Sequence, residues 1–257
     1  MRASQQVMGT VVSFLLRDSP RTTTETDAAA EALERAQARL RWIDDVFSTW
    51  KPQSPVSRLR RGEIGLEQAP PEVSEVLELC RRVRAASDGW FDPWSMPGGV
   101  DPTGLVKGWA AERALDELKA AGVPAAMINA GGDVAVYGEP EDGQAWRIGV
   151  RHPLDPDAMI LVAEIEGPGA VATSGTYERG DHLLDPASGA PVNGLLSATV
   201  IGRDLAFADA LATAVFVSDG QLLERIGRLK GYHAIVVDAD GGLRASRGFP
   251  VGLRFAA

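Results

Sequence analysis

The sequence predicts an α+β fold, α/β-like in its alternation, in which helices cover a mixed β-sheet within one domain spanning residues 1–257. Three observations favour this class. Helical and strand-like apolar patterns are interleaved, the strand-like segments in the middle lie too close together for helical crossovers, and no low-complexity linker divides the chain. Hydrophobic residues make up 45% and charged residues 24% of the sequence, and a chain of 257 residues can bury a large core.

The first part of the chain predicts one strand, two helices and a long loop. Thr10–Arg17 is a β-branched run typical of a strand. Asp27–Asp45 repeats apolar residues at helical spacing, with Asp27 as its expected N-cap. Phe47–Gly62 has three serines, two prolines and no periodicity, which predicts a loop, and Glu72–Ser87 predicts a second amphipathic helix.

The second part predicts a surface loop, more helices and a series of short strands. Asp88–Gly104 is rich in glycine, proline, aspartate and tryptophan and is expected to be a surface loop, and Lys107–Gly122 predicts a third helix. The predicted strands that follow are Ala125–Ile128, Val134–Tyr137, Trp146–Val150, Ile160–Ile165, Ala170–Thr173 and Ser197–Ile201. The chain then predicts helices at Ala206–Val217 and Gln221–Leu229, and a hairpin made of Ala234–Val237 and Leu243–Arg247.

Composition excludes several classes of protein. The net charge of −9 argues against a broad nucleic-acid interface, and the short basic clusters Arg58–Arg61 and Arg81–Arg84 are expected to be solvated faces, with phosphate binding as the alternative. No stretch approaches the roughly 18 apolar residues of a membrane span, and the start of the chain has no apolar signal segment, so we expect a cytoplasmic protein. The single cysteine, Cys80, excludes an internal disulfide and a cysteine-based zinc site, and we expect it in the core.

Two turns that follow predicted strands carry groups able to bind a ligand. Asn129–Asp133 has paired glycines, which let a backbone approach phosphate oxygens closely; a tight β-turn with an Asx hydrogen bond is the alternative. The predicted strand Ala170–Thr173 ends in Ser174-Gly175-Thr176-Tyr177, which is a second, hydroxyl-rich elbow. Neither turn is specific by itself.

Two helices carry a candidate anion site and a candidate metal site. Gly104–Gly108 opens a helix, and a helix N-terminus with a lysine can bind an anion, although the spacing is not that of a Walker A loop. Asp209 and Thr213 lie one turn apart on an otherwise small and apolar helix and therefore share a face. One carboxylate and one hydroxyl suit Mg²⁺, which keeps waters and takes phosphate oxygens as further ligands. The alternative is a solvent-exposed aspartate that caps the start of the helix.

His182 is one of three histidines and stands beside acidic residues, which makes it a candidate general base. A structural histidine in a turn is the alternative.

Taken in order, the motifs of this chain resemble those of the ApbE family, the FAD:protein FMN transferases. The motifs are Met8-Gly9-Thr10, Phe47-Ser48-Thr49-Trp50 with Ser54-Pro55-Val56-Ser57-Arg58-Leu59, Gly89-Trp90-Phe91-Asp92-Pro93, Gly104-Leu105-Val106-Lys107-Gly108, Asn129-Ala130-Gly131-Gly132-Asp133, Ala172-Thr173-Ser174-Gly175, His182-Leu183-Leu184-Asp185-Pro186 with Ser188-Gly189, and Ala208-Asp209-Ala210-Leu211-Ala212-Thr213. The resemblance runs from residue 8 to about residue 217 and is specific because it depends on no single motif.

The resemblance implies a Mg²⁺-dependent enzyme that uses FAD as a substrate. Such an enzyme transfers FMN by a phosphoester bond to a threonine or serine hydroxyl of a target flavoprotein and releases AMP. It implies Asp209, Thr213 and the carbonyl of Gly104 as metal ligands and Trp50 as the aromatic residue against the flavin. The residues implied in the FAD site are Met8, Asp92, Lys107, Asp133, Thr173 and Ser174, with His182 and Lys107 as the catalytic pair.

The chain departs from the family pattern in three places. Only ten residues separate Pro93 from Gly104, where many relatives have a longer insertion; Asp101–Gly104 replaces the usual Asp-Leu-Gly-Gly; and the export signal common among relatives is missing. Two other functions remain open: an FAD pyrophosphatase that uses water, and a protein that binds FAD without cleaving it.

Overall fold

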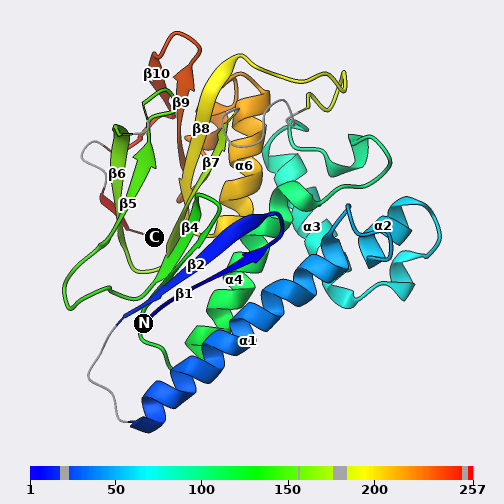
Figure 1. Cartoon of the computed structure of the whole chain (residues 1–257). Coiled ribbons are helices and arrows are strands. Elements are labelled where there is room, and N and C mark those ends of the chain that lie inside the picture. The colour runs from blue at the N-terminus through cyan, green and yellow to red at the C-terminus, as the bar shows by residue number, and fades with distance from the viewer. Residues whose placement is uncertain (18–22, 156, 176–183, 251–253, 257) are drawn as a thin grey trace.

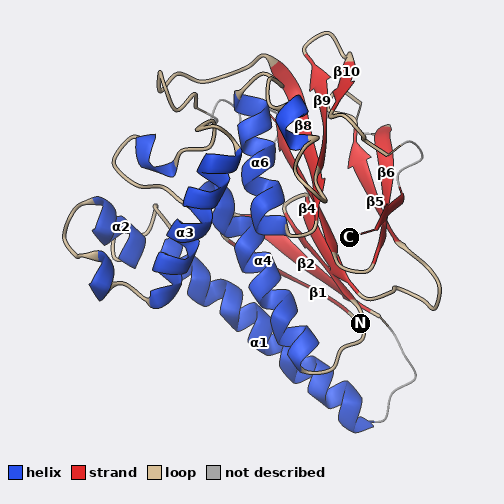
Figure 2. Cartoon of the chain, turned by 180° about the vertical axis from the view of Figure 1, so that it is seen from behind, coloured by secondary structure: helices blue, strands red, loops and turns tan. Residues whose placement is uncertain are grey.

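The molecule has three layers: a layer of helices, a large β-sheet, and a small β-sheet on the far side of the large one (Figures 1 and 2). This arrangement is that of a computed structural model, which describes residues 1–17, 23–155, 157–175, 184–250 and 254–256. Within these ranges, no helix combines the length and the apolar character that crossing a membrane would require.

The elements are interleaved along the chain. The helices are α1 (Thr23–Phe47), α2 (Pro55–Arg60), α3 (Pro71–Ala86), α4 (Thr103–Ala120), α6 (Leu205–Val217) and α7 (Leu223–Ile226), with short 3₁₀-helices η1 (Leu66–Gln68) and η2 (Pro93–Ser95). The strands are β1 (Arg2–Val7), β2 (Thr10–Leu16), β3 (Ala126–Ala130), β4 (Asp133–Tyr137), β5 (Trp146–Arg151), β6 (Met159–Glu166), β7 (Gly169–Gly175), β8 (Leu195–Gly202), β9 (His233–Asp238), β10 (Leu243–Ala245) and β11 (Arg254–Ala256).

The large sheet has eight strands in the order β1-β2-β3-β4-β7-β8-β9-β10, and each neighbouring pair in it is antiparallel. The small sheet has the order β11-β6-β5, in which β5 and β6 are antiparallel and β11 and β6 are parallel. The predicted α+β class is therefore confirmed, and the parallel pairing among the described strands lies in the small sheet.

Two apolar cores lie on the two faces of the large sheet, and β4 shows why both are needed. Each of its five residues is buried, which a strand achieves only when both of its faces are covered. Val134 and Val136 contribute to the core against the small sheet, whereas Ala135 and Tyr137 contribute to the core against the helices. The strand β5 instead alternates buried and exposed residues, because the small sheet has one face in solvent.

Helix α6 is the most buried helix of the helical layer and lies next to α4 (Figure 2). Eleven of its residues are buried, and five of these are alanines. The two helices approach closely at Gly108 of α4, where an added Cβ would lie 2.5 Å from the carbonyl oxygen of Leu205 and 3.0 Å from the Cα of Ala206. Glycine is therefore required at position 108 by backbone packing.

The structure corrects several predicted boundaries in the first part of the chain. Helix α1 begins at Thr23, so Asp27 lies inside the helix and is not its N-cap. The predicted loop at residues 47–62 contains α2, whose N-cap Ser54 accepts a hydrogen bond from the N–H of Ser57 at 3.0 Å. Strand β1 was not predicted, because an edge strand with largely exposed, polar side chains shows no apolar run.

Other boundaries also differ from the prediction. Helix α4 begins at Thr103, four residues before the predicted start, so the Gly104–Gly108 segment lies wholly within its first turns. The predicted helix at residues 221–229 is reduced to the single turn α7, and β10 ends at Ala245. Strand β11 was not predicted.

Candidate functional site

One end of the large sheet gathers several of the predicted site residues. The antiparallel register places the start of β2, the end of β3, the start of β4 and the end of β7 at the same end. Met8 lies there in the two-residue turn between β1 and β2, Asp133 begins β4, and Thr173 and Ser174 lie near the end of β7. Residues from distant parts of the chain are thus brought together by strand pairing.

The turn that carries Met8 has an uncommon backbone conformation. Met8 and Gly9 have φ angles of 54° and 70°, as in the tight two-residue turns that match the twist of a hairpin. A left-handed conformation is common for glycine but costs free energy for methionine. Met8 lines a cavity at this position, so the turn holds a flexible apolar side chain at a binding surface.

A cavity of about 570 Å³ lies between this end of the sheet, the start of α4, helix α6 and the end of α1. Its volume falls within the roughly 300–1,000 Å³ typical of ligand pockets. Nine of the eleven predicted site residues line it: Met8, Trp50, Asp92, Gly104, Lys107, Thr173, Ser174, Asp209 and Thr213. Asp133 lies behind Lys107, and His182 lies outside the described residues.

The polar end of the cavity contains an ion pair between Lys107 and Asp133. The Nζ of Lys107 lies 2.5 Å from the Oδ2 of Asp133, whose side chain is only 1% exposed. The backbone N–H of Thr173 donates to the Oδ1 of Asp133 at 2.9 Å. A buried carboxylate needs such compensation, and here one cation and one N–H supply it. Asp133 therefore fixes Lys107 relative to the end of β7.

Asp209 is buried on α6 and faces the first turns of α4. It is 5% exposed, its Oδ2 accepts a hydrogen bond from the N–H of Gly108 at 3.1 Å, and its Oδ1 lies 3.9 Å from the Nζ of Lys107. The alternative of a solvent-exposed helix cap is wrong, because Asp204 is the N-cap of α6 and accepts from the N–H of Phe207 at 3.0 Å.

Thr213 lies one turn beyond Asp209 on the same face of α6. Its hydroxyl is 3.3 Å from the hydroxyl of Ser174, which brings α6 and β7 into contact through polar atoms. Gly104 lines the same cavity. In a regular helix the carbonyl of Gly104 would accept from the N–H of Gly108, which here also donates to Asp209. A carbonyl oxygen has two lone pairs, so this oxygen can still bind a further partner.

The oxygen donors at this end fit a hard divalent cation. A carboxylate, a hydroxyl and a backbone carbonyl are ligand types that Mg²⁺ accepts. Lys107 supplies one positive charge against the two carboxylates of Asp133 and Asp209, so these three groups carry a net negative charge, which disfavours a phosphate ligand unless a cation is added. No group of three or more histidine, cysteine, aspartate or glutamate side chains with metal-binding geometry occurs among the described residues, so a cation here would need backbone, hydroxyl or ligand oxygens.

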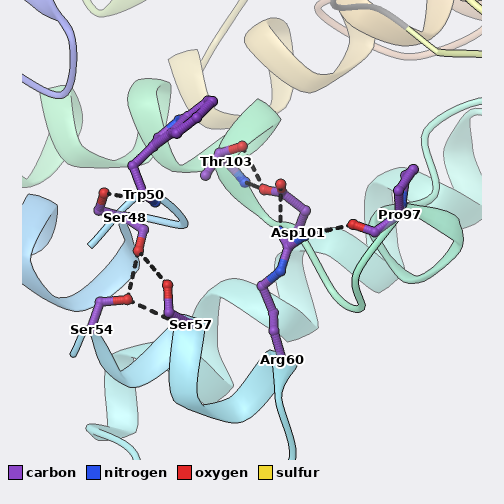
Figure 3. Close-up of polar contacts among 8 residues, drawn as sticks. All are labelled: Ser48, Trp50, Ser54, Ser57, Arg60, Pro97, Asp101 and Thr103. Atoms are coloured by element: carbon purple, nitrogen blue, oxygen red, sulfur yellow. Dashed lines mark hydrogen bonds and ion pairs between the residues drawn. The ribbon is translucent and has the colours of Figure 1, made fainter. Parts of the chain in front are cut away.

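The aromatic end of the cavity is the part that Trp50 lines. The side chain of Trp50 is 93% exposed, although Trp50 lines the cavity. Its backbone is held in place: the N–H of Trp50 donates to the hydroxyl of Ser48 at 3.3 Å, and the carbonyl of Ser48 accepts from the hydroxyls of Ser54 at 2.6 Å and Ser57 at 3.1 Å (Figure 3). An exposed indole on an anchored turn can cover one face of a flat ring system.

Lys51 anchors the same turn to the end of α1. Its Nζ lies 2.5 Å from Asp44 and 2.7 Å from Asp45, and hydrogen bonds to these two carboxylates raise the pKa of Lys51. Asp44 and Lys51 both line the cavity, and sequence reasoning did not select either of them. The signal was weak, since an acidic pair at the end of a helix followed by a lysine is common on protein surfaces.

Asp92 lines the cavity, and both oxygens of its carboxylate accept hydrogen bonds from nearby residues. It accepts from the Nε of Arg84 at 2.7 Å and from the N–H of Trp94 at 3.0 Å, which caps the short helix η2. Asp92 therefore shapes the loop that follows α3. A second, open pocket lies over Arg81, Arg84 and Trp94 and shares Asp92 with the main cavity.

The glycine turn between β3 and β4 has a different role from the one expected. The described residues that line the cavity include neither Gly131 nor Gly132. The N–H of Gly132 donates to the side-chain oxygen of Asn129 at 2.8 Å, which is the Asx hydrogen bond of the alternative interpretation. The turn contributes to the site by placing Asp133, and not by offering its N–H groups to the cavity.

Fold and cavity together define a class of protein: an α+β protein with a ligand-sized cavity that is lined by an exposed tryptophan and by oxygen donors of the types that a hard cation accepts. The chain belongs to the ApbE family, whose model matches residues 8–98 and 96–236.

Curated relatives in this family are named FAD:protein FMN transferase. The chain is 33% identical to one from Rhodobacter capsulatus over 151 residues, which are 56% of this chain and 28% of that protein, and 35% identical to one from Vibrio cholerae over 127 residues, which are 46% of this chain and 38% of that protein. These matches thus span about a third of the relatives' length. A relative from Klebsiella pneumoniae is 26% identical over 84% of this chain and 79% of its own length.

Solved structures share the fold. The ApbE protein of Thermotoga maritima superimposes with a TM-score of 0.82 at 25% identity, covering 97% of both chains. The flavin transferase ApbE of Vibrio cholerae superimposes with a TM-score of 0.80 at 21% identity, also over 97% of both chains.

Proposed function

We propose that this protein is a Mg²⁺-dependent FAD:protein FMN transferase. It would transfer FMN from FAD to a threonine or serine hydroxyl of a target flavoprotein. A phosphoester bond forms between the acceptor oxygen and the phosphorus of FMN, the bridging bond of the pyrophosphate breaks, and AMP leaves. Membership of the ApbE family and the names of its relatives support this activity.

One observation carries the proposal: a single cavity is lined by an exposed indole, a lysine, the buried carboxylate of Asp209 and two hydroxyls, and a second carboxylate pairs with the lysine behind it. A flavin dinucleotide has the complementary shape, since a flat ring system and a pyrophosphate lie in one molecule. Trp50 would bind a face of the ring system, and Met8 offers an apolar contact from the neighbouring turn.

Mg²⁺ would be held by the carboxylate of Asp209, the hydroxyl of Thr213 and the carbonyl of Gly104. When bound, it would neutralise charge on the pyrophosphate oxygens, which is the main requirement of phosphoryl transfer. The structure supports this donor set through the burial of Asp209 and the shared cavity.

Lys107 would act with the pyrophosphate at the same end. Because its ammonium is already paired with Asp133, its charge is held at a fixed position and is largely compensated. Lys107 would therefore orient the phosphates more than neutralise them. His182 is the proposed base that accepts the proton of the acceptor hydroxyl; it lies outside the described residues, and mutagenesis has to test it.

The test is incubation of the protein with FAD, MgCl₂ and a flavoprotein domain that carries a target threonine. We expect AMP in solution and an acceptor whose mass rises by one phosphoester-linked FMN. A variant of the acceptor with valine in place of the threonine is the matched control. AMP and free FMN at the same rate without acceptor would identify an FAD pyrophosphatase instead. Bound but uncleaved FAD under every condition would identify a non-catalytic FAD-binding protein.

A further inference from the structure

The guanidinium of Arg60 connects two segments that are far apart in the sequence. Its Nη1 lies 2.7 Å from the Oδ2 of Asp101, and its Nη2 donates to the carbonyl of Pro97 at 2.7 Å (Figure 3). The side chains of Arg60 and Asp101 are 15% and 23% exposed, so this ion pair is mostly withdrawn from solvent. The interpretation of residues 58–61 as a solvated basic face therefore does not hold for Arg60.

Asp101, which pairs with Arg60, is also hydrogen-bonded to the start of α4. Its Oδ1 accepts from the N–H of Thr103 at 3.0 Å and from the hydroxyl of Thr103 at 2.6 Å, and its own N–H donates to the carbonyl of Pro93 at 2.9 Å. These bonds fix the first turn of α4, in which Gly104 lines the cavity. Both oxygens of Asp101 are thus used, one toward Arg60 and one toward the helix.

At its other end, the helix that carries Arg60 holds the turn of Trp50. Helix α2 is only six residues long. Ser54, its N-cap, and Ser57 both donate to the carbonyl of Ser48, whose hydroxyl accepts from the N–H of Trp50. Figure 3 shows the two groups of contacts on either side of this helix. Helix α2 therefore links the aromatic end of the cavity to the segment that begins α4.

The loop before α4 is shaped around Arg60. At Gly99, where φ is +105°, an added Cβ would lie 3.1 Å from the carbonyl oxygen of Arg60, and at Gly98 it would lie 3.1 Å from the Nη2. Glycines at both positions let the loop wrap the arginine closely. The short loop between Pro93 and Gly104 thus takes its shape from one side chain of another helix.

We propose that Arg60 is a positioning residue for the transfer reaction. Through Asp101 it fixes the spacing between the Trp50 turn and the first turn of α4, and hence between the flavin and the pyrophosphate of one bound FAD. The proposal rests on the function proposed above. Arg60 itself need not touch FAD. Arginine suits this role because its planar fork bonds a carboxylate and a carbonyl at once, whereas lysine offers a single ammonium group.

Hydrogen exchange on the protein without FAD is the first test, because it does not depend on activity. In Arg60→Lys we expect faster exchange at the amides of Asp101 and Thr103. Arg61→Lys is the matched control: Arg61 also bonds a carboxylate, that of Glu63, and a proline carbonyl, that of Pro52, but both partners lie in its own segment. Unchanged exchange in Arg60→Lys, or equal acceleration in both variants, would overturn the proposal.

Kinetics provide the second test. For Arg60→Lys we expect kcat to fall about tenfold or more, with KM for FAD changed less than about threefold. The reason is that a small displacement of the reacting groups lowers the reaction rate more than it lowers the affinity for the substrate. Asp101→Asn should behave alike, and the double variant should be no slower than the slower single variant, since both break one connection. Additive losses, or equal effects on kcat and KM, would assign Arg60 a general structural role.

The two proposals fail in different ways. If wild-type protein binds FAD but releases no AMP, the proposed function is wrong, while the exchange experiment still decides whether Arg60 orders the loop. If wild-type protein is active and Arg60→Lys keeps the wild-type kcat, the positioning role is wrong. Should Arg60→Lys not be recovered folded, Asp101→Asn, which keeps an oxygen acceptor for Thr103, carries both tests with the same outcomes.

Discussion

Replacing Trp50 with alanine should weaken FAD binding and leave the fold intact. The side chain is 93% exposed, so little of the folded protein packs against it, and the free energy of unfolding should change by less than about 0.5 kcal/mol. A tryptophan buries roughly 150–250 Å² when fully covered. Stacking on one face would cover about 100 Å², and at ~25 cal/mol per Å² this gives about 2.5 kcal/mol, or a ~70-fold rise in Kd for FAD.

The assay is titration of FAD without an acceptor, with AMP monitored to establish that FAD stays intact. Flavin fluorescence gives the Kd, and stacking on an indole should quench it, so Trp50→Ala should also lessen the quenching. Trp94→Ala is the control: Trp94 is 39% exposed and lies in the neighbouring open pocket, beneath Arg81. Equal Kd values for wild type and Trp50→Ala, or equal losses in both variants, would refute the stacking role of Trp50.

Four further outcomes follow from the geometry. Asp209→Asn should abolish AMP release while the melting temperature stays close to wild type, since asparagine can still accept from the N–H of Gly108. Metal-dependent turnover by this variant would contradict the role of Asp209 as a metal ligand. Removal of divalent cations by EDTA should weaken FAD binding by calorimetry, because the lysine and two carboxylates at the polar end leave a negative charge uncompensated; unchanged affinity would count against a cation site. Gly108→Ala should lower the free energy of unfolding by about 1–3 kcal/mol, because the new Cβ would lie 2.5 Å from the carbonyl oxygen of Leu205. Urea denaturation measures this change. A stability equal to that of wild type would show that α4 and α6 can move apart without cost. Burial raises the pKa of Glu112 from 4.5 to about 7, so its protonated form stabilises the fold below pH 4.5, and this contribution of roughly 3 kcal/mol is lost as the pH rises through 7. Thermal unfolding of wild type and Glu112→Gln between pH 5 and 8 should show that the stability of wild type relative to the variant falls as the pH rises. A relative stability that stays constant over this range would contradict the raised pKa.

Glu112 belongs to a group of side chains that are hydrogen-bonded at the start of α6. Its carboxyl accepts from the N–H of Leu205 at the start of α6, where Asp204 is the cap and the hydroxyl of Tyr232 donates to Asp204. Burial, and then the hydrogen bond to Asp204, raise the pKa of Tyr232. Two N–H groups at the positive, N-terminal end of α6 are therefore bonded to side chains of this chain.

The sequence predicted best those features that depend on one-sided burial or on a conspicuous polar residue. Helix α3 shows its buried face directly, because Val73, Val76, Cys80 and Val83 recur at helical spacing. Cys80 is part of this buried face, and burial raises the pKa of its thiol to about 12, although the positive charge of Arg81 acts in the opposite direction. Asp209 stood out because a carboxylate on an apolar helix face requires a partner or a metal.

Other features lacked a local signature. Helix α2 has a Ser-Pro start typical of a helix N-terminus, yet its six residues are too few to show a periodic apolar face. The pair of Arg60 and Asp101 joins residues 41 positions apart, and a single basic residue in a basic cluster gives no sign of which one is buried. Trp50 could be placed in the site only through the family resemblance, since an exposed tryptophan in a loop has many explanations.

The alanines of α6 have a consequence for how readily the protein can vary. Because this helix contacts its neighbours through small side chains, an alanine-to-valine change at position 208, 210 or 212 would displace the helix axis and move Asp209 and Thr213 with it. Residues 50–53 of the Trp50 turn, by contrast, are exposed, so new side chains there would not disturb the core. Laboratory evolution toward new acceptors or flavins should therefore accumulate changes at the rim and leave α6 almost untouched.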